Sequence, residues 1–169
     1  IEKIIKGARK KLILISPFLQ VSENLLHRLI DAENRGVSIT LIYGKAELKS
    51  NEEQALSKLK NLTLYYFDKL HAKCYFNEEE MIITSMNMYE YSENNNREMG
   101  VLIYRKQDAE LFSHAVDEAK SILRASEEKP LFMSKKDRAE QYNKTARRSG
   151  PQVQKEGVCI RFCTTIDYD

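Results

Sequence analysis

The stretch LHAKCYFNEEEMIITSMN, residues 70–87, decides how we expect this chain to fold. Two apolar runs in it, 70–76 and 81–86, have the length and composition of β-strands, and the polar letters NEEE between them are typical of a hairpin loop. If Asn77 pairs with Met81, the loop holds the three glutamates. Side chains two positions apart on a strand lie on one face, so this register decides which side chains meet across the hairpin.

Four polar side chains of this hairpin share one face in that register. His71 lies opposite Asn87, and Lys73 lies opposite Ser85. A histidine can attack phosphorus, and a lysine can neutralise the oxygens of a phosphate. A lysine inside a fold needs an anion, and no acidic residue lies two positions from Lys73 to supply one. The pattern therefore indicates a site for a phosphate ester, although a slip of one residue would send one pair to the other face.

These residues resemble the signature of the phospholipase D superfamily, which runs His-x-Lys, an acidic residue, Gly-Ser-x-Asn and then a glutamate. The matching positions are His71, Lys73, Ser85, Asn87 and Glu98. The resemblance covers roughly residues 1–125 and implies a phosphodiesterase. It implies that His71 attacks phosphorus while Lys73 and Asn87 hold the phosphate oxygens. We expect Glu98 to accept a hydrogen bond from His71 and so to fix the tautomer of its ring.

Two positions depart from the family pattern. Thr84 stands where the family usually has glycine. Either Asn77 or Glu78 takes the place of the family's aspartate. In the family that aspartate orients the strands and does not touch the phosphate, so we expect this change to affect stability more than chemistry.

The chain carries one copy of the motif and no internal repeat. Cleavage of a phosphodiester through a histidine needs a second imidazole that protonates the leaving oxygen and later activates water. The resemblance implies that members with a single motif form homodimers, in which His71 of each subunit contributes to one active site. A closed twofold interface is also the commonest way to form an oligomer. No divalent metal or other cofactor is then required for catalysis.

The rest of the chain alternates helix and strand. The apolar periodicity predicts helices over 1–10, 22–34, 50–59 and 108–124, and strands over 11–16, 37–43, 62–67 and 98–104. Strands interleaved with helices argue for an α/β fold with helices on both faces of the sheet, and the hairpin makes that sheet mixed. The fold class is therefore an α/β, phospholipase D-like domain with a mixed β-sheet, followed by a basic C-terminal tail.

Composition and charge divide the chain into a body and a tail. We expect the catalytic domain to cover 1–126 and the tail to cover 127–169. Residues 129–161 hold nine Lys and Arg against three acidic side chains, which suits a polyanion such as nucleic acid, an anionic membrane surface, or else a solvated linker. No apolar run approaches the roughly 20 residues that span a bilayer, and no signal peptide opens the chain, so we expect a cytoplasmic protein. Because the first residue is Ile, we expect a piece of a longer chain.

Three cysteines without a regular framework fit a reducing compartment. Cys159 and Cys163 resemble the first half of a zinc ribbon, which would need a second pair of ligands for a structural zinc. The alternative is two free thiols in the tail. Cys74 lies in an expected strand, so we assign it to the core.

The resemblance and the charge pattern favour one function over two alternatives. We expect a metal-independent endonuclease that acts on DNA or RNA, because the tail is basic and the sequence shows no lipid-binding apolar stretch. The first alternative is a phospholipid headgroup hydrolase or transferase, which would require an exposed apolar rim near His71. The second is a catalytically inactive nucleic-acid-binding module.

Overall fold

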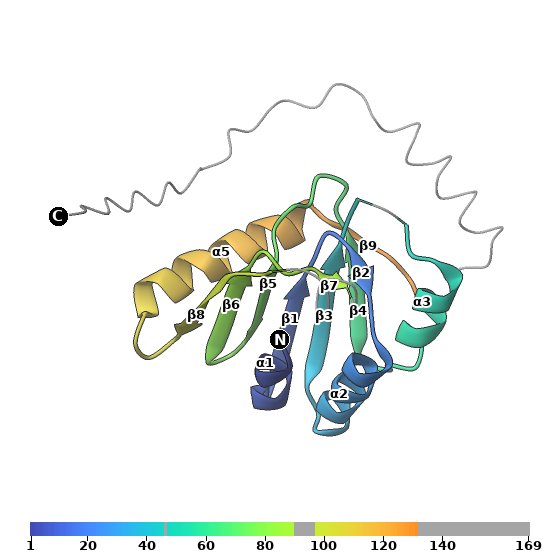
Figure 1. Cartoon of the computed structure of the whole chain (residues 1–169), viewed down its shortest axis with the longest axis horizontal. Helices are drawn as coiled ribbons and strands as arrows, with labels where there is room; N and C mark the ends of the chain where they lie inside the picture. Colours follow the sequence, from blue (N-terminus) through green and yellow to red (C-terminus); the bar gives the residue numbers. More distant parts are fainter. Residues whose placement is uncertain (46, 90–96, 132–169) are drawn as a thin grey trace. The chain divides into compact units, whose positions relative to one another are not determined.

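The computed structural model of the chain describes residues 1–45, 47–89 and 97–131. Its elements are α1 (Glu2–Gly7), β1 (Lys11–Ile15), β2 (Leu19–Gln20), α2 (Glu23–Asn34), β3 (Ser38–Tyr43), α3 (Ser50–Leu56), β4 (Leu62–Tyr66), β5 (Cys74–Asn77), β6 (Glu80–Thr84), β7 (Met88–Tyr89), β8 (Gly100–Tyr104), α5 (Ala109–Ala125) and β9 (Glu127–Glu128). Seven strands form one sheet in the order β8-β6-β5-β1-β3-β4-β9 (Figure 1). Only β1, β3 and β4 run parallel within it, so the predicted mixed sheet is confirmed.

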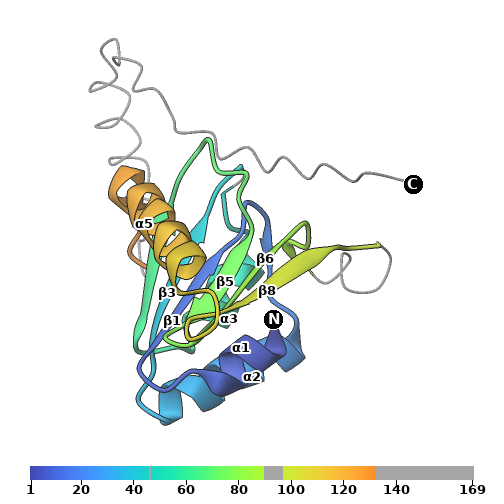
Figure 2. The same ribbon diagram turned by 90° about the vertical axis from the view of Figure 1, so that its left-hand side faces the viewer.

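The sheet is covered on both faces, and each face has its own core. In β1, Leu12 and Leu14 pack with α1, α2 and α3, whereas Ile15 packs on the opposite face with Phe112 of α5. Figure 2 shows α5 on one side of the sheet and α1 and α2 on the other. The alternation of strand side chains between two apolar layers is what the sequence pattern predicts for a buried strand.

Helix α2 begins and ends at the residues that its sequence indicates. Ser22 is the N-cap, and its hydroxyl accepts a hydrogen bond from Leu25 N at 3.3 Å. Gly36 follows the helix with a φ of 84°, a left-handed conformation that glycine adopts at no steric cost. Between these ends the helix buries Leu25, Leu26, Leu29 and Ala32 against the sheet.

The hairpin of β5 and β6 differs from the predicted register by one residue. Tyr75 pairs with Ile82, and Phe76 pairs with Met81. The loop therefore holds only two glutamates, and Glu80 begins β6. The predicted pairing of Asn77 with Met81 is wrong.

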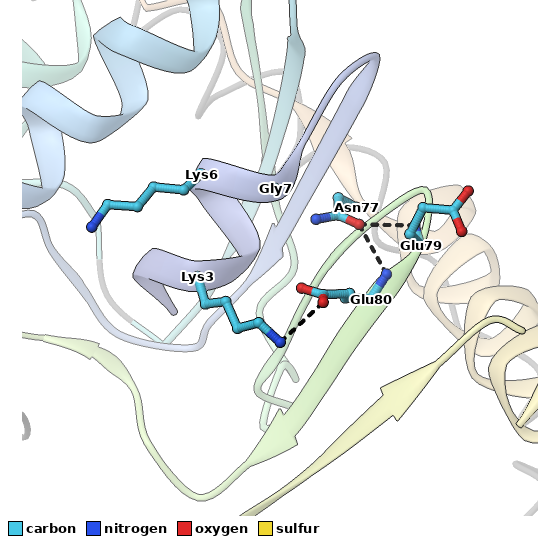
Figure 3. Close-up of a pocket in the computed structure, with 6 residues that line it drawn as sticks. All are labelled: Lys3, Lys6, Gly7, Asn77, Glu79 and Glu80. Atoms are coloured by element: carbon cyan, nitrogen blue, oxygen red, sulfur yellow. Dashed lines mark hydrogen bonds and ion pairs between the residues drawn. The ribbon is translucent and has the colours of Figure 1, made fainter. Parts of the chain in front are cut away.

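The side chain of Asn77 gives a physical reason for this register. Its Oδ1 accepts hydrogen bonds from Glu79 N at 2.8 Å and from Glu80 N at 2.9 Å, which closes a two-residue turn (Figure 3). Its Nδ2 donates to Ile4 O of α1 at 2.8 Å. The side chain is almost fully buried, and Gly7 leaves room for it, because a Cβ at that position would lie 3.2 Å from Nδ2. The turn is thus set by its contact with α1.

The two residues of β9, Glu127 and Glu128, follow the expected domain end at 126 and still belong to the sheet. Tyr66 of β4 pairs with Glu127 of β9, and Leu131 packs against the core on the α1 face. The first compact unit spans Ile1–Phe132. Most of the basic segment and both tail cysteines lie outside the described residues. No described helix has the length and apolar character needed to cross a membrane.

Candidate active site

Ser85 and Glu98, which lie in separate segments, meet directly. The hydroxyl of Ser85 donates a hydrogen bond to the Glu98 carboxylate. Met99 N donates to the same Ser85 oxygen at 3.0 Å, and Ser85 N donates to Met99 O at 2.9 Å. The expected hydrogen bond between His71 and Glu98 stays a prediction, whereas the contact with Ser85 is a feature that sequence reasoning missed.

Two hydroxyls outside the motif hold the peptide groups between Ser85 and Asn87. Met86 N donates to Thr84 Oγ1 at 3.1 Å, and Tyr75 Oη donates to Met86 O at 2.8 Å. Tyr75 is fully buried, so its hydroxyl is a fixed anchor. Both polar groups of Met86 are therefore paired, which fixes the backbone between the two motif residues.

Asn87 is held from its other side by Ser16, which follows β1 and is buried. Met88 N donates to Ser16 Oγ at 2.8 Å, and Ser16 Oγ donates to Phe18 O at 2.6 Å. The chain then forms β7, which pairs with β2. The Oδ1 atom of Asn87 is buried and has no hydrogen-bond partner among the described residues. A buried acceptor of this kind calls for a donor, which a bound molecule or a second copy of the chain can supply.

His71 and Lys73 lie in the loop before β5 and not in a strand as predicted. His71 is exposed and Lys73 is half-buried. The backbone of Lys73 faces Thr84, since Thr84 N donates to Lys73 O at 3.2 Å. The predicted pairing of Lys73 with Ser85 across the hairpin is therefore wrong by one residue, and so is the pairing of His71 with Asn87 that followed from the same register.

A close backbone contact fixes the start of this loop. A Cβ on Gly44 would lie 2.2 Å from Phe67 O and 2.8 Å from the Cβ of Leu70, so only glycine fits there. Leu70 is buried in the core on the α5 face. These contacts anchor the residue directly before His71.

Glu78 and Asn77, one of which we expect to take the place of the family's aspartate, both bind backbone groups through their side chains. The Glu78 carboxylate accepts hydrogen bonds from three successive backbone groups, Arg9 N at 2.6 Å, Lys10 N at 2.9 Å and Lys11 N at 3.4 Å. Burial raises the pKa of Glu78, but the hydrogen bonds from backbone N–H groups lower it by a larger amount, so the pKa of Glu78 lies below its ordinary value. Asn77 is the last residue of β5 and Glu78 follows it, at the end of the strand that is far from Lys73. Their contacts are with the turn, α1 and β1, which is a structural arrangement.

A hollow of about 580 Å³ lies at this same far end of the hairpin, between α1 and the turn. Lys3, Lys6 and Glu80 are among the residues that line it (Figure 3). The ammonium group of Lys3 lies 3.0 Å from the Glu80 carboxylate, and that of Lys6 lies 3.0 Å from Glu2. Both ammonium groups are therefore already paired with carboxylates of the chain.

An exposed apolar rim follows the Ser85–Glu98 contact along the edge of the sheet. Met99 is 83% exposed, Val101 is 61% exposed and Ile83 is 40% exposed. Val101 of β8 pairs with Ile83 of β6, so these two side chains share one face. Large apolar side chains that gather on a surface commonly mark an interface with protein or lipid.

The cysteines and possible metal ligands add no further site within the described ranges. There, no group of three or more His, Cys, Asp and Glu could hold a metal ion. Cys74 is buried in the core on the α5 face as predicted, and burial raises its pKa to about 12, so it stays a thiol. Cys159 and Cys163 lie outside the described residues, and the zinc half-site stays a prediction.

Comparisons with known proteins agree with this architecture. The structure of Nuc from Salmonella typhimurium, described as a phospholipase D family member, is 16% identical and aligns over 76% of this chain and 87% of its own, with a TM-score of 0.60. The archaeal chromatin protein TrmBL2, described as binding DNA, is 20% identical over 76% of this chain and 49% of its own, with a TM-score of 0.52. The phosphatidylserine synthase of Haemophilus influenzae Rd KW20 is 17% identical over 86% of this chain and 41% of its own, with a TM-score of 0.65. No curated protein sequence matches the chain.

At these identities the three structures establish a shared fold. The family model described as "Cardiolipin synthase, PLD-like domain" matches residues 1–123, most of the chain. The chain therefore belongs to the phospholipase D superfamily.

Proposed function

We propose that the chain is a metal-independent phosphodiesterase that cleaves nucleic acid as a homodimer. The observation that supports this proposal is that the segments which carry Lys73, Ser85 and Glu98 contact one another at one end of the sheet. Lys73 O accepts from Thr84 N, the next residue is Ser85, and the Ser85 hydroxyl contacts Glu98. Residues that lie up to 25 positions apart in the sequence thus come from three neighbouring segments to one place.

The proposed reaction has two steps that share one phosphorus. A ring nitrogen of His71 attacks phosphorus and forms a P–N bond while the P–O bond to the leaving alcohol breaks. His71 of the second copy gives its proton to the leaving oxygen. Water then attacks phosphorus and breaks the P–N bond, while the second imidazole takes the proton of that water. Lys73 and the amide of Asn87 stabilise the charge on the non-bridging oxygens in both transition states.

Nucleic acid is the proposed substrate because the chain joins this site to a strongly basic segment. That segment, 129–161, lies almost wholly outside the described residues, and its charge is read from the sequence. The structural similarity to TrmBL2, which is described as binding DNA, also favours nucleic acid as the substrate. Substituting Gln for Lys135, Lys136, Arg147 and Arg148 should weaken DNA binding and flatten its salt dependence, because each lost phosphate contact removes about one counterion from the slope.

The central experiment compares two histidine variants with the wild-type protein in excess EDTA. Single-stranded DNA, double-stranded DNA and RNA serve as substrates. His71→Ala should abolish cleavage, and His27→Ala, which removes an exposed histidine of α2, should leave the rate unchanged. Sedimentation of the same samples should give a dimer. Cleavage by the His71 variant at the wild-type rate, or full activity in a monomer, would contradict the proposal.

A second candidate function is hydrolysis or transfer of a phospholipid headgroup. The exposed rim of Met99, Val101 and Ile83 favours it, because a lipid enzyme needs an apolar surface beside its catalytic groups. Incubation with anionic phospholipid vesicles separates the two functions. A lipid enzyme should release headgroup, and Val101→Ser should lower that rate while leaving cleavage of bis(4-nitrophenyl) phosphate unchanged. If the rim instead forms the dimer contact, Val101→Ser should weaken the dimer.

A further inference from the structure

Thr84, the last residue of β6, connects the two segments that carry the site. Its Oγ1 donates to Met99 O at 2.9 Å and accepts from Met86 N at 3.1 Å. Met86 lies between Ser85 and Asn87, and Met99 directly follows the glutamate of the motif. One hydroxyl therefore holds backbone groups on both sides of the candidate site.

The hydroxyls of Thr84 and Ser85 both form hydrogen bonds to the backbone of Met99. Thr84 Oγ1 binds the carbonyl oxygen of Met99, and Ser85 Oγ accepts from its N–H at 3.0 Å. The peptide groups on the two sides of Met99 are thus fixed, although its side chain is 83% exposed and contributes little packing. Because Glu98 precedes Met99, these two bonds, together with the backbone bond from Ser85 N to Met99 O, hold the segment that carries its carboxylate.

Gly100 provides the space that this arrangement requires. It pairs with Thr84 across β6 and β8, and a Cβ on Gly100 would lie 2.8 Å from the Thr84 Cβ and 3.0 Å from its Oγ1. Any side chain at position 100 would push Thr84 away from its partners. The close approach of these two strands is therefore matched to a threonine on one strand and a glycine on the other.

We propose that Thr84 is a positioning residue of the active site. Its hydroxyl holds the turn from Ser85 to Asn87 against Glu98, so that the Ser85–Glu98 contact and the Asn87 amide keep one geometry while phosphate is bound. The inference rests on the proposed phosphodiesterase function. Thr84 itself needs no contact with the substrate, because it acts through the backbone of the residues that do.

Three variants separate the hydroxyl from the packing of the side chain. Thr84→Val keeps the shape and removes the hydroxyl, whereas Thr84→Ser keeps the hydroxyl and removes the methyl group. Thr63→Val makes the same exchange at a half-buried threonine of β4, away from the motif. The substrate is bis(4-nitrophenyl) phosphate, a small diester that needs neither the basic segment nor a lipid surface. Exchange of the Met86 amide proton, followed by NMR, reports the geometry without any reaction.

Thr84→Val should lower kcat about tenfold with little change in KM, because misplaced groups cost transition-state binding more than substrate binding. Thr84→Ser should recover most of that loss, and Thr63→Val should behave as wild type. The Met86 amide should exchange faster in Thr84→Val alone. A purely structural contribution of the methyl group would instead give loss in Thr84→Ser and recovery in Thr84→Val, and would overturn the inference.

The same samples distinguish failure of the inference from failure of the proposed function. If the wild-type protein cleaves no phosphodiester, the proposed function fails. Affinity for inorganic tungstate, whose expanded coordination mimics the transition state of phosphoryl transfer, and the exchange of Met86 then decide the inference. Weaker tungstate binding and faster exchange in Thr84→Val, both restored in Thr84→Ser, support it. Unchanged kcat, affinity and exchange in Thr84→Val overturn it whether or not the wild-type protein is active.

Discussion

Asn77→Asp tests whether the buried turn fixes the hairpin to α1. The two side chains have nearly the same shape, so packing is conserved and only hydrogen bonding and charge change. Asp keeps both bonds from Glu79 N and Glu80 N, but it loses the donor that reaches Ile4 O at 2.8 Å. The variant would bring the chain closer to the family's aspartate, yet we expect it to be less stable.

The expected cost of Asn77→Asp follows from the bond that is lost and from the charge that replaces it. Ile4 O keeps its hydrogen bond from Ala8 N at 3.1 Å, so the variant loses one hydrogen bond of about 1 kcal/mol, and a buried carboxylate oxygen that faces the carbonyl adds desolvation and electrostatic repulsion. We expect a loss of about 2–4 kcal/mol in the free energy of unfolding at pH 7. Asn77→Ala, which removes all three hydrogen bonds, should cost at least as much.

The pH dependence of Asn77→Asp gives the sharper measurement. The two backbone N–H bonds lower the pKa of the introduced carboxyl group, whereas burial and the facing carbonyl raise it. We expect the second pair of effects to be larger, so that the folded-state pKa lies above about 3.9, its value in an unfolded chain. The penalty is therefore full above the raised pKa and shrinks as pH falls through it, because the protonated acid can donate to Ile4 O. Urea unfolding of the variant and the wild-type protein at pH 7 and pH 4 measures the difference. Asn77→Ala serves as the control, since its cost relative to wild type should not change with pH.

Two results would refute this account of Asn77. A loss below about 0.5 kcal/mol at pH 7 would show that the bond to Ile4 O contributes nothing measurable. A loss that is equal at pH 7 and pH 4 would show that the new carboxyl group does not face the carbonyl. Either result would leave the observed hairpin register without its physical reason.

Three further predictions concern other parts of the chain. Because the folded pKa of Glu78 is lowered, its carboxylate stabilises the fold above the unfolded pKa of about 4.3, and this contribution is lost as pH falls through the folded pKa. Glu78→Gln should therefore lower the free energy of unfolding by under about 1 kcal/mol at pH 7 and should make it fall less steeply as the pH is lowered. Parallel pH profiles of the variant and the wild-type protein would contradict this. Gly100→Ala should cost about 1–3 kcal/mol in urea unfolding, and less in a Thr84→Gly background, whereas additive costs would disprove the clash. His71→Ala should abolish hydrolysis without lowering the Tm, because the side chain is exposed, and Ser85→Ala should lose less activity.

Most of the fold could be predicted because its signals are local. The apolar runs that became β1, β3 and β4 each stand between recognisable helix signals, and Ser22 and Gly36 mark the two ends of α2 as expected. Such signals depend on hydrogen bonds and φ angles within a few residues. The alternation of strands and helices then limits the architecture to a covered sheet.

The register of the hairpin could not be predicted because a distant contact decides it. The letters NEEE allow a loop of two or of three residues, and the apolar pattern of 81–86 fits either. The choice depends on Asn77 meeting Ile4 O, which comes from a helix 73 positions earlier in the chain. The tendency of asparagine to bond to the backbone of its own turn was the one local signal that could have indicated the shorter loop.

Two hydroxyl contacts beside the candidate site were missed for a related reason. Ser16 and Thr84 both bind backbone atoms of other segments through their hydroxyl groups. Backbone atoms are the same at every position, so no residue pattern reveals such a pairing. Only the motif residues, whose chemistry requires particular side chains, can be found by their spacing.

The two ends of the hairpin contact different parts of the chain. The difference of one residue between the predicted and the observed register therefore matters little for the candidate site. The ladder between β5 and β6 begins at Cys74 and ends at the pairing of Phe76 with Met81, so His71 and Asn87 lie outside it. Their positions depend on loop contacts and on the hydroxyl anchors, not on strand pairing. Changes at Asn77 should therefore alter the stability of the fold with little effect on the site, whereas changes at Thr84 should alter the site with little effect on the register.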